Sequence, residues 1–258
     1  MKVVIFAGGM GTRLAEETST RPKPMVEIGG KPILWHIMKI YSHYGFNDFV
    51  ICLGYKGFMI KEYFINYFLY NSDITVELGS NKVDVHYSNG EALKVTLVDT
   101  GIETNTAGRL KKVQRFLDNE TFMLTYGDGV TDLNIQSLID FHKQSGNLAT
   151  LTSVQIPGRF GNIEMDGQGK VSKFQEKPLD DRIWINGGFF VLEPGIFKFL
   201  DGDMDEIQWE KGPLIEIANK GLLGAHKHYG FWKCMDALRD RIELDELWYS
   251  GNAKWKIW

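Results

Sequence analysis

Five charged residues lie in short motifs beside apolar or glycine-rich segments of the sequence. They are Arg13, Lys23, Asp128, Lys177 and Asp236. Side chains at the carboxyl ends of strands in an open α/β sheet point into the crevice where such sheets bind ligands. Carboxylates combined with phosphate oxygens suit Mg²⁺, and fixed lysine and arginine cations suit phosphate groups. These residue types therefore favour chemistry on phosphorylated ligands, in which positioning and charge neutralisation matter most.

A glycine-rich loop follows the first predicted strand. Residues 2–6 form a β-branched apolar run that is typical of a buried parallel strand. Gly8, Gly9 and Gly11 come next, and glycine lets backbone N–H groups approach an anion closely. The spacing fits neither a P-loop nor a dinucleotide fingerprint. A triphosphate cradle and a plain strand-to-helix turn both remain open.

Each later motif admits a structural as well as a functional interpretation. Asp128, flanked by glycines, is either a metal ligand or a turn residue. Glu176 and Lys177 either hold a sugar phosphate or form a solvated surface pair. Asn186 either bonds a sugar hydroxyl or marks a β-bulge. Asp236 is either a second metal ligand or a helix N-cap.

The order of these motifs resembles the sugar-1-phosphate nucleotidylyltransferase family over nearly the whole chain. The motifs are G-G-x-G-T-R, K-P, G-D-G, E-K-P, N-G-G and W-x-x-x-D. The resemblance is strongest to the cytidylyl members, which implies CTP and α-D-glucose 1-phosphate as substrates and Mg²⁺ as the cofactor. It also implies a homo-oligomer such as a hexamer, and a role in supplying nucleotide sugars for surface polysaccharide synthesis.

The resemblance assigns a role to each motif residue. It implies that the nucleotide is bound by Phe6, Ala7, Gly8, Gly9, Met10, Gly11, Thr12, Arg13, Lys23, Thr104, Arg109 and Asp128. The sugar phosphate is expected at Glu176, Lys177, Asn186 and Gly187, and the metal ion at Asp128 and Asp236. The residues expected to act in catalysis are Arg13, Lys23, Asp128 and Lys177.

Two departures from the family pattern bear on these assignments. The family motif W-x-D-x-G-T is altered here, because Trp232 and Asp236 are further apart and no Gly-Thr follows. The role of Asp236 therefore stays open. The base-contacting stretch G-T-A-G appears as residues 103–109, which indicates a changed base pocket with Thr104 and Arg109 as its contacts.

Two other functions remain open from the sequence. Another nucleotidylyltransferase, using UTP, dTTP or GTP, or mannose 1-phosphate, would carry the same motif chemistry. A non-catalytic nucleotide-sensing subunit could share the fold, since fold does not fix function. The joint presence of Arg13, Lys23, Asp128 and Lys177 favours an enzyme.

Composition narrows the class of protein further. The chain has 258 residues and a formal net charge of −4, which gives no case for binding nucleic acid or a membrane surface. Cys52 and Cys234 have neither metal-ligand spacing nor a disulfide framework. No signal peptide or membrane-spanning stretch is evident, so we expect a cytoplasmic protein.

The periodicity of the sequence predicts the elements that position the motifs. Strand-like and helix-like segments alternate, which is typical of an α/β fold with a Rossmann-like, mixed, mostly parallel sheet flanked by helices. Helices are expected at residues 31–45, 57–71, 106–117, 134–146, 213–220 and 236–249. Besides residues 2–6, strands are expected at residues 49–54, 74–78, 83–87, 94–98, 121–126, 149–155, 161–164, 170–177, 185–192 and 225–232.

We expect a single nucleotidyltransferase domain over residues 1–258. Residues 1–130 would form the nucleotide-binding half, with a strand-rich excursion at residues 72–104. Residues 131–258 would form the sugar-phosphate-binding half and a C-terminal helical tail.

Two aromatic-rich segments leave alternatives open. The tail, with Trp248, Trp255 and Trp258, either forms a subunit interface or packs back onto its own chain. The rings of residues 57–71 are expected mainly in the core, with a subunit contact as the weaker alternative. His36 falls on a predicted helix and is interpreted as a structural or surface group.

Overall fold

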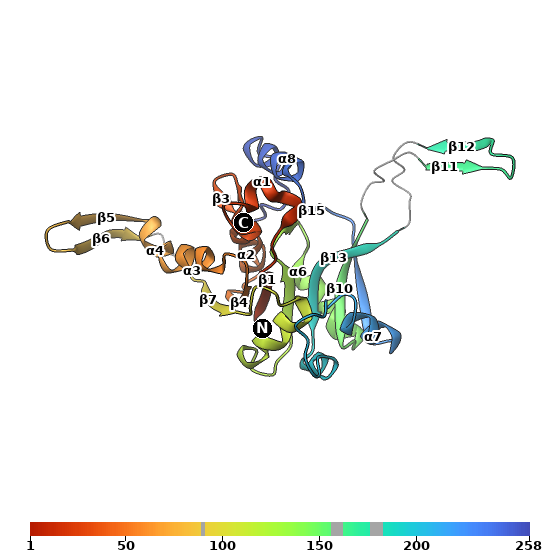
Figure 1. The fold of residues 1–258 in the computed structure, drawn as a ribbon, viewed down its shortest axis with the longest axis horizontal. Helices are drawn as coiled ribbons and strands as arrows, with labels where there is room; N and C mark the ends of the chain where they lie inside the picture. Colours follow the sequence, from red (N-terminus) through yellow and green to blue (C-terminus); the bar gives the residue numbers. More distant parts are fainter. Residues whose placement is uncertain (89–90, 156–161, 176–182) are drawn as a thin grey trace.

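A computed structural model of the protein describes residues 1–88, 91–155, 162–175 and 183–258, and it contains a central seven-stranded sheet (Figure 1). In spatial order the strands are β14 (Leu223–His228), β10 (Ala149–Val154), β13 (Ile185–Leu192), β8 (Phe122–Tyr126), β1 (Val3–Ala7), β4 (Asp48–Leu53) and β7 (Lys94–Asp99). Strands β8, β1, β4 and β7 run parallel, as do β10 and β14, whereas β13 is antiparallel to both its neighbours. The predicted mixed, mostly parallel sheet is therefore confirmed.

Helices cover both faces of this sheet, because its strands are apolar on both sides. Val3 and Ile5 point into one core and Val4 and Phe6 into the other, as the two-residue period of a strand requires. The first core is covered by α2 (Ile33–His43), α3 (Gly57–Ile65), α6 (Ile135–Ser145) and α8 (Leu238–Tyr249). The second core is covered by α5 (Thr106–Val113) and α7 (Pro213–Asn219). No described helix is long and apolar enough to cross a membrane.

Local signals in the sequence mark the ends of α2 and the start of α6. Pro32 immediately precedes α2, and Gly45, with φ of 84°, lies just beyond its end. The Asn134 side chain accepts a hydrogen bond from the Ser137 N–H at the start of α6. The helix expected over residues 57–71 is instead divided at Asn66 into α3 and the short α4 (Tyr67–Tyr70).

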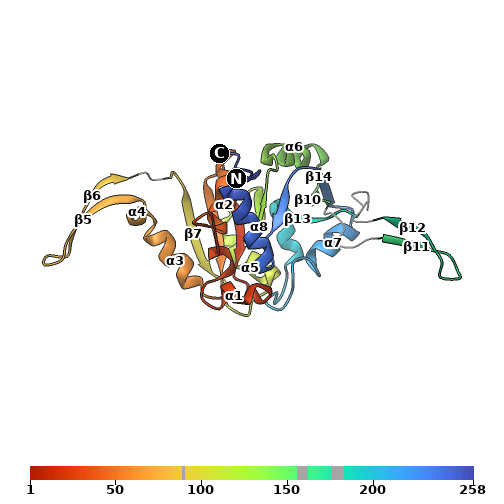
Figure 2. The ribbon, with the colours of Figure 1, turned by 90° about the horizontal axis from the view of Figure 1, so that it is seen from above.

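Two hairpins extend from opposite sides of the body (Figures 1 and 2). One consists of β5 (Ser72–Glu77) and β6 (Lys82–Ser88), and the other of β11 (Asn162–Met165) and β12 (Val171–Gln175). Leu78, in the turn of the first hairpin, is 86% exposed. Phe58 of α3 and Tyr70 of α4 are 66% and 68% exposed, so the expectation that the rings of this segment lie mainly in the core is wrong for them.

Two small antiparallel pairs of strands lie outside the central sheet and the two hairpins. The short helix α1 (Ala15–Thr18) follows the glycine-rich loop. The strands β2 (Glu27–Ile28) and β3 (Lys31–Pro32) form one pair. The strands β9 (Gly129–Thr131) and β15 (Trp232–Cys234) form another, and this pair joins the two predicted halves of the chain directly beside Asp128.

The C-terminal tail packs back onto its own chain around a histidine. Trp255 and His36 are both 0% exposed, and the Trp255 Nε1–H donates to His36 Nδ1 over 3.3 Å. The His36 Nε2–H donates to the Ile28 carbonyl over 2.8 Å. Trp248 and Trp258 also contact the His36 ring, at centroid distances of 4.8 and 6.2 Å. We call His36, Trp248, Trp255 and Trp258 the tail cluster.

Candidate active site

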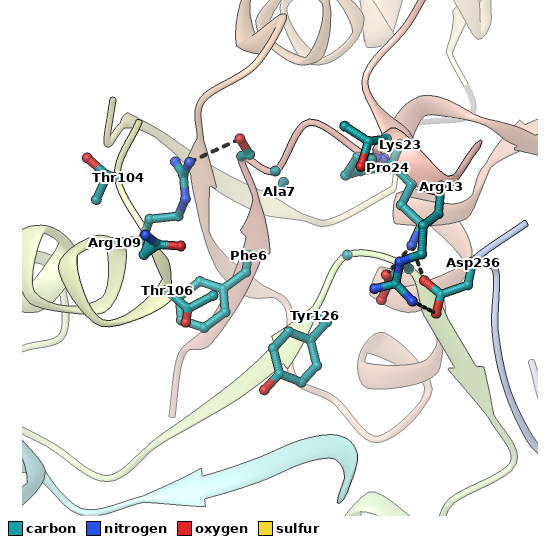
Figure 3. A pocket seen from close by; sticks show the side chains of 17 residues that line it. Phe6, Ala7, Arg13, Lys23, Pro24, Thr104, Thr106, Arg109, Tyr126 and Asp236 are labelled. Atoms are coloured by element: carbon teal, nitrogen blue, oxygen red, sulfur yellow. Dashed lines mark hydrogen bonds and ion pairs between the residues drawn. The ribbon is translucent and has the colours of Figure 1, made fainter. Parts of the chain in front are cut away.

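A cavity of about 310 Å³ lies at the carboxyl ends of β1 and β8 (Figure 3). It is lined by the glycine-rich loop, the start of α5 and the segment that follows β8. The lining residues are Phe6, Ala7, Gly8, Gly9, Gly11, Thr12, Arg13, Lys23, Pro24, Thr104, Asn105, Thr106, Arg109, Tyr126, Gly127, Asp128 and Asp236. This edge of a parallel sheet is where open α/β folds bind ligands.

A second cavity, of about 200 Å³, lies beside the first. Asn186 and Gly187 line it, because β13 is antiparallel to β8 and so begins at the edge where β8 ends. The two cavities share four lining residues, namely Arg13, Tyr126, Asp128 and Asp236. Two ligands, one in each cavity, would therefore come together at these four side chains.

Four charged side chains meet at this junction. The Lys23 ammonium lies 2.6 Å from an Asp128 carboxylate oxygen and 2.7 Å from an Asp236 oxygen. The Arg13 guanidinium lies 2.8 Å from the other oxygen of Asp236, as Figure 3 shows. We call Arg13, Lys23, Asp128 and Asp236 the charge cluster.

Pairing of strands brings the two carboxylates of the charge cluster together. Cys234 of β15 lies opposite Gly129 of β9, and the Met235 N–H donates to the Asp128 carbonyl over 2.8 Å. Asp236 does not cap α8, because Ala237 occupies the N-cap position. The N–H groups of Asp236 and Ala237 instead donate to the Asp240 carboxylate. The N-cap alternative for Asp236 is therefore wrong.

Lys23 is held as a cation between the two aspartates. Burial by itself lowers the pKa of Lys23, but the charges of Asp128 and Asp236 and their hydrogen bonds together outweigh it and raise that pKa. Gly11 allows the approach of the lysine, since it has φ of 64° and a Cβ there would lie 3.1 Å from Lys23 Cβ.

The two aspartates fit a magnesium site that is completed by substrate. Among the described residues, no group of three or more His, Cys, Asp or Glu side chains is arranged to hold a metal ion. However, Asp128 and Asp236 already bracket one cation, the Lys23 ammonium, and both line both cavities. Mg²⁺ prefers such a pair of carboxylates, with phosphate oxygens and water as its other ligands.

Arg109 supports the glycine-rich loop through a hydrogen bond to its backbone. Its Nη2 donates to the Gly8 carbonyl over 3.0 Å, and its Nη1 donates to Leu53, Thr100 and Gly101 oxygens. Burial lowers the pKa of Arg109. A Cβ at Gly8 would lie 2.1 Å from Nη1, so this packing requires glycine. The contact of Arg109 with a base stays a prediction.

Most of the nucleotide residues expected from the sequence line the first cavity. Met10 does not, and its side chain is 45% exposed. Glu176 and Lys177 lie outside the described residues. Sequence reasoning missed Tyr126, although its position directly before Gly127 at the end of a strand was a usable signal. It also missed Thr106 and Trp232, which line the first and second cavity.

Comparisons with known proteins show to which family the chain belongs. The sequence model of the family described as "Nucleotidyl transferase" matches residues 2–240. Glucose-1-phosphate cytidylyltransferase of Salmonella typhi is 55% identical over 259 residues, covering 100% of both chains. The Bacillus subtilis (strain 168) protein named "Probable glucose-1-phosphate cytidylyltransferase" is 43% identical, again over 100% of both.

Solved structures agree on the fold. The crystal structure of apo-UDP-glucose pyrophosphorylase has a TM-score of 0.69 to this chain at 18% identity, covering 97% of this chain and 99% of that one. The motif resemblance is thereby confirmed by full-length sequence similarity and by architecture. This chain belongs to the nucleotidyl transferase family.

Proposed function

We propose that this protein is a glucose-1-phosphate cytidylyltransferase, converting CTP and α-D-glucose 1-phosphate into CDP-glucose and diphosphate. The observation that supports this most is the charge cluster at the junction of two cavities, which offers two cations and two carboxylates to two polyanions. The full-length relatives that bear this name support the choice of substrates.

The reaction needs no general base from the protein. A phosphomonoester has its second pKa near about 6, so the sugar phosphate is largely a dianion at neutral pH. Its oxygen attacks the α-phosphorus of CTP as the bond to the leaving diphosphate breaks. The obstacles are repulsion between two anions and the charge that builds on the leaving group, so positioning and charge neutralisation supply the catalysis.

The charge cluster addresses both obstacles. Asp128 and Asp236 would hold Mg²⁺, which when bound supplies charge neutralisation to the phosphate oxygens. Arg13 and Lys23 stabilise the leaving diphosphate, and the glycine-rich loop binds the triphosphate through its N–H groups. Thr104 and Arg109 form part of the base pocket. Arg109 acts there mainly through the loop that it supports.

The second cavity would bind the sugar phosphate. Asn186 and Gly187 line this cavity and are proposed to contact the hexose. Glu176 and Lys177 complete the proposal from the motif resemblance, with Lys177 on the phosphate and Glu176 near the hydroxyls. Residues 1–130 would thus mainly bind nucleotide and residues 131–258 sugar phosphate.

Replacing the carboxylate of Asp128 tests this function. Asp128→Asn should reduce Mg²⁺-dependent diphosphate release from CTP and glucose 1-phosphate by about 1,000-fold or more, because a metal ligand and a partner of Lys23 are lost together. The unfolding temperature should change little. Near-normal activity of the variant would refute the role of Asp128.

A substrate panel with the wild-type protein tests the choice of substrates. Diphosphate release is measured with CTP, UTP, dTTP and GTP, each paired with glucose 1-phosphate and mannose 1-phosphate. We expect the highest kcat/KM with CTP and glucose 1-phosphate, and a higher value for any other pair would reassign the enzyme within its family.

Three further proposals concern the oligomeric state, the cellular location and the biosynthetic role of the protein. A homo-oligomer, such as a hexamer, is supported by the exposed apolar residues of the β5–β6 hairpin, including Leu78. The molar mass of the purified protein, measured by light scattering, tests this. A cytoplasmic location and a role in O-antigen or dideoxyhexose synthesis stay predictions from the motif resemblance.

A further inference from the structure

The Glu210 carboxylate lies next to Tyr126, a residue that lines both cavities. Glu210 lines neither of them, but it accepts a hydrogen bond from the Tyr126 hydroxyl over 2.5 Å. Its other oxygen accepts a hydrogen bond from the Thr106 hydroxyl over 2.9 Å. Tyr126 ends β8 and Thr106 begins α5, so the Glu210 side chain joins these two elements.

Tyr126 lies at the border of the two cavities. It lines both cavities, and in Figure 3 its ring lies between Phe6 and Thr106 on one side and the charge cluster on the other. The ring is fixed by packing: its centroid lies 6.0 Å from that of Phe6, and Gly188, with φ of 80°, leaves the space that the ring occupies. Tyr126 has little freedom to reorient.

The Glu210 carboxylate also determines the direction in which the two hydroxyl groups donate. A carboxylate can only accept hydrogen bonds, so both the Tyr126 and the Thr106 proton point away from the cavities and toward Glu210. The Thr106 oxygen additionally accepts a hydrogen bond from the backbone N–H of Trp209 over 2.7 Å. Burial and the Glu210 charge raise the pKa of Tyr126, so its proton is retained at neutral pH. The Asn186 side chain also hydrogen-bonds to the Tyr126 hydroxyl, so toward a ligand Tyr126 presents the lone pair that Asn186 does not occupy.

We propose that Glu210 is a positioning residue that turns Tyr126 into a fixed hydrogen-bond acceptor for a sugar hydroxyl at the junction of the two cavities. This inference rests on the proposed function. The hydroxyl belongs either to the ribose of the nucleotide or to the hexose of the sugar phosphate, since Tyr126 borders both cavities. Glu210 contacts neither substrate and acts through Tyr126.

Substrates with one sugar hydroxyl replaced by fluorine test the proposal, because fluorine can accept weakly but cannot donate. One arm uses CTP analogues fluorinated on the ribose, and the other uses glucose 1-phosphates fluorinated on the hexose. KM and kcat are measured for each, together with Kd by calorimetry. At one position the wild-type protein should prefer hydroxyl over fluorine by about tenfold or more.

Glu210→Gln should lower that preference at the same position by about fivefold or more, because an amide offers only one acceptor and can itself donate. Tyr126→Phe should lower it as much, and the two changes together should do no more than either alone. The ratio of hydroxyl to fluoro substrate is the decisive readout, since a merely structural loss would weaken both substrates equally. Tyr126→Phe also covers the case in which Glu210→Gln does not fold.

Glu206→Gln serves as the matched control, because it removes the same charge from an exposed residue of the same segment. It should leave every ratio unchanged. Ratios that stay the same in Glu210→Gln and Tyr126→Phe at all positions of both arms would overturn the inference. Failure of the wild-type protein to turn over the parent substrates would instead overturn the proposed function, and the Kd ratios would still test the role of Glu210.

Discussion

The charge cluster and the tail cluster are both assembled from distant parts of the chain, but with opposite chemistry. In the charge cluster, partly exposed ionised groups meet at a cavity over 2.6 to 2.8 Å. In the tail cluster, the buried His36 is surrounded by neutral rings, and its two ring nitrogens have partners. Burying ions costs free energy even when they are paired, whereas burying rings with satisfied N–H groups stabilises a fold.

This contrast implies a division between activity and stability. Substitutions in the charge cluster should abolish turnover and leave the fold intact. Substitutions in the tail cluster should lower the free energy of unfolding and leave the turnover of folded molecules unchanged. A tail-cluster variant that loses activity while folded, or a charge-cluster variant that loses stability, would show that the two regions are coupled. Such coupling would pass through α8, which begins just after Asp236.

Lys23→Met should give the largest effect. We expect kcat/KM to fall by about 1,000-fold or more, because the cation that faces the leaving diphosphate is removed. Addition of Mg²⁺ should raise the unfolding temperature of this variant more than that of the wild-type protein, since Asp128 and Asp236 then lack their ammonium partner. Steady-state kinetics and thermal unfolding check both points, and an unchanged kcat/KM would remove Lys23 from the mechanism.

Trp255→Ala should lower the free energy of unfolding by about 4 kcal/mol, as expected for truncating a large buried ring. The His36 nitrogen that accepts the Trp255 N–H would also lose its partner. Urea unfolding measures the loss, and kcat per folded molecule, measured well below the unfolding midpoint, should stay near that of the wild-type protein. A large loss of kcat would show that the tail supports the active site directly.

His36 should make stability depend on pH. Burial, helped by the charge of Lys256, lowers the pKa of His36 to about 4, although hydrogen bonds to Ile28 and Lys31 and the charge of Asp245 oppose this. Protonation would also place a second N–H against the Trp255 donor. Because the unfolded histidine takes up its proton near pH 6.5, stability should fall as the pH drops from about 6.5 to 4, by about 3 kcal/mol.

His36→Gln is the variant that isolates this effect, since glutamine does not titrate. Urea unfolding at several pH values should show a smaller loss of stability for the variant than for the wild-type protein over the same range. Parallel pH profiles of the two proteins would mean that carboxylates elsewhere, and not His36, cause the acid sensitivity.

The smallest effect is expected for a charge pair outside both clusters. Lys82 and Asp84 of the β5–β6 hairpin pair over 2.8 Å, and both side chains are exposed. Lys82→Ala should change the free energy of unfolding by less than about 0.5 kcal/mol and leave kcat/KM unchanged. A larger change would show that this pair does more than an isolated surface ion pair can.

The sequence alone determined those features of the fold whose signals are local. The apolar run before Gly8 predicts β1, and the glycine after Tyr44 and the asparagine before Ile135 mark helix ends, because caps and strand periodicity act over a few residues. The motif order predicted the fold and the family. The prediction of one continuous helix over residues 57–71 was wrong, because the spacing of the aromatic residues continues through Asn66 although the helix does not.

Tertiary structure decided which distant side chains meet. Asp236 reaches Asp128 only because β15 pairs with β9, and the sequence left an N-cap role for Asp236 open. Glu210 reaches Tyr126, and Trp255 reaches His36, across separations for which no spacing rule exists. The physical reason is that such contacts follow from how whole elements pack around the two cores, which no single stretch of sequence encodes.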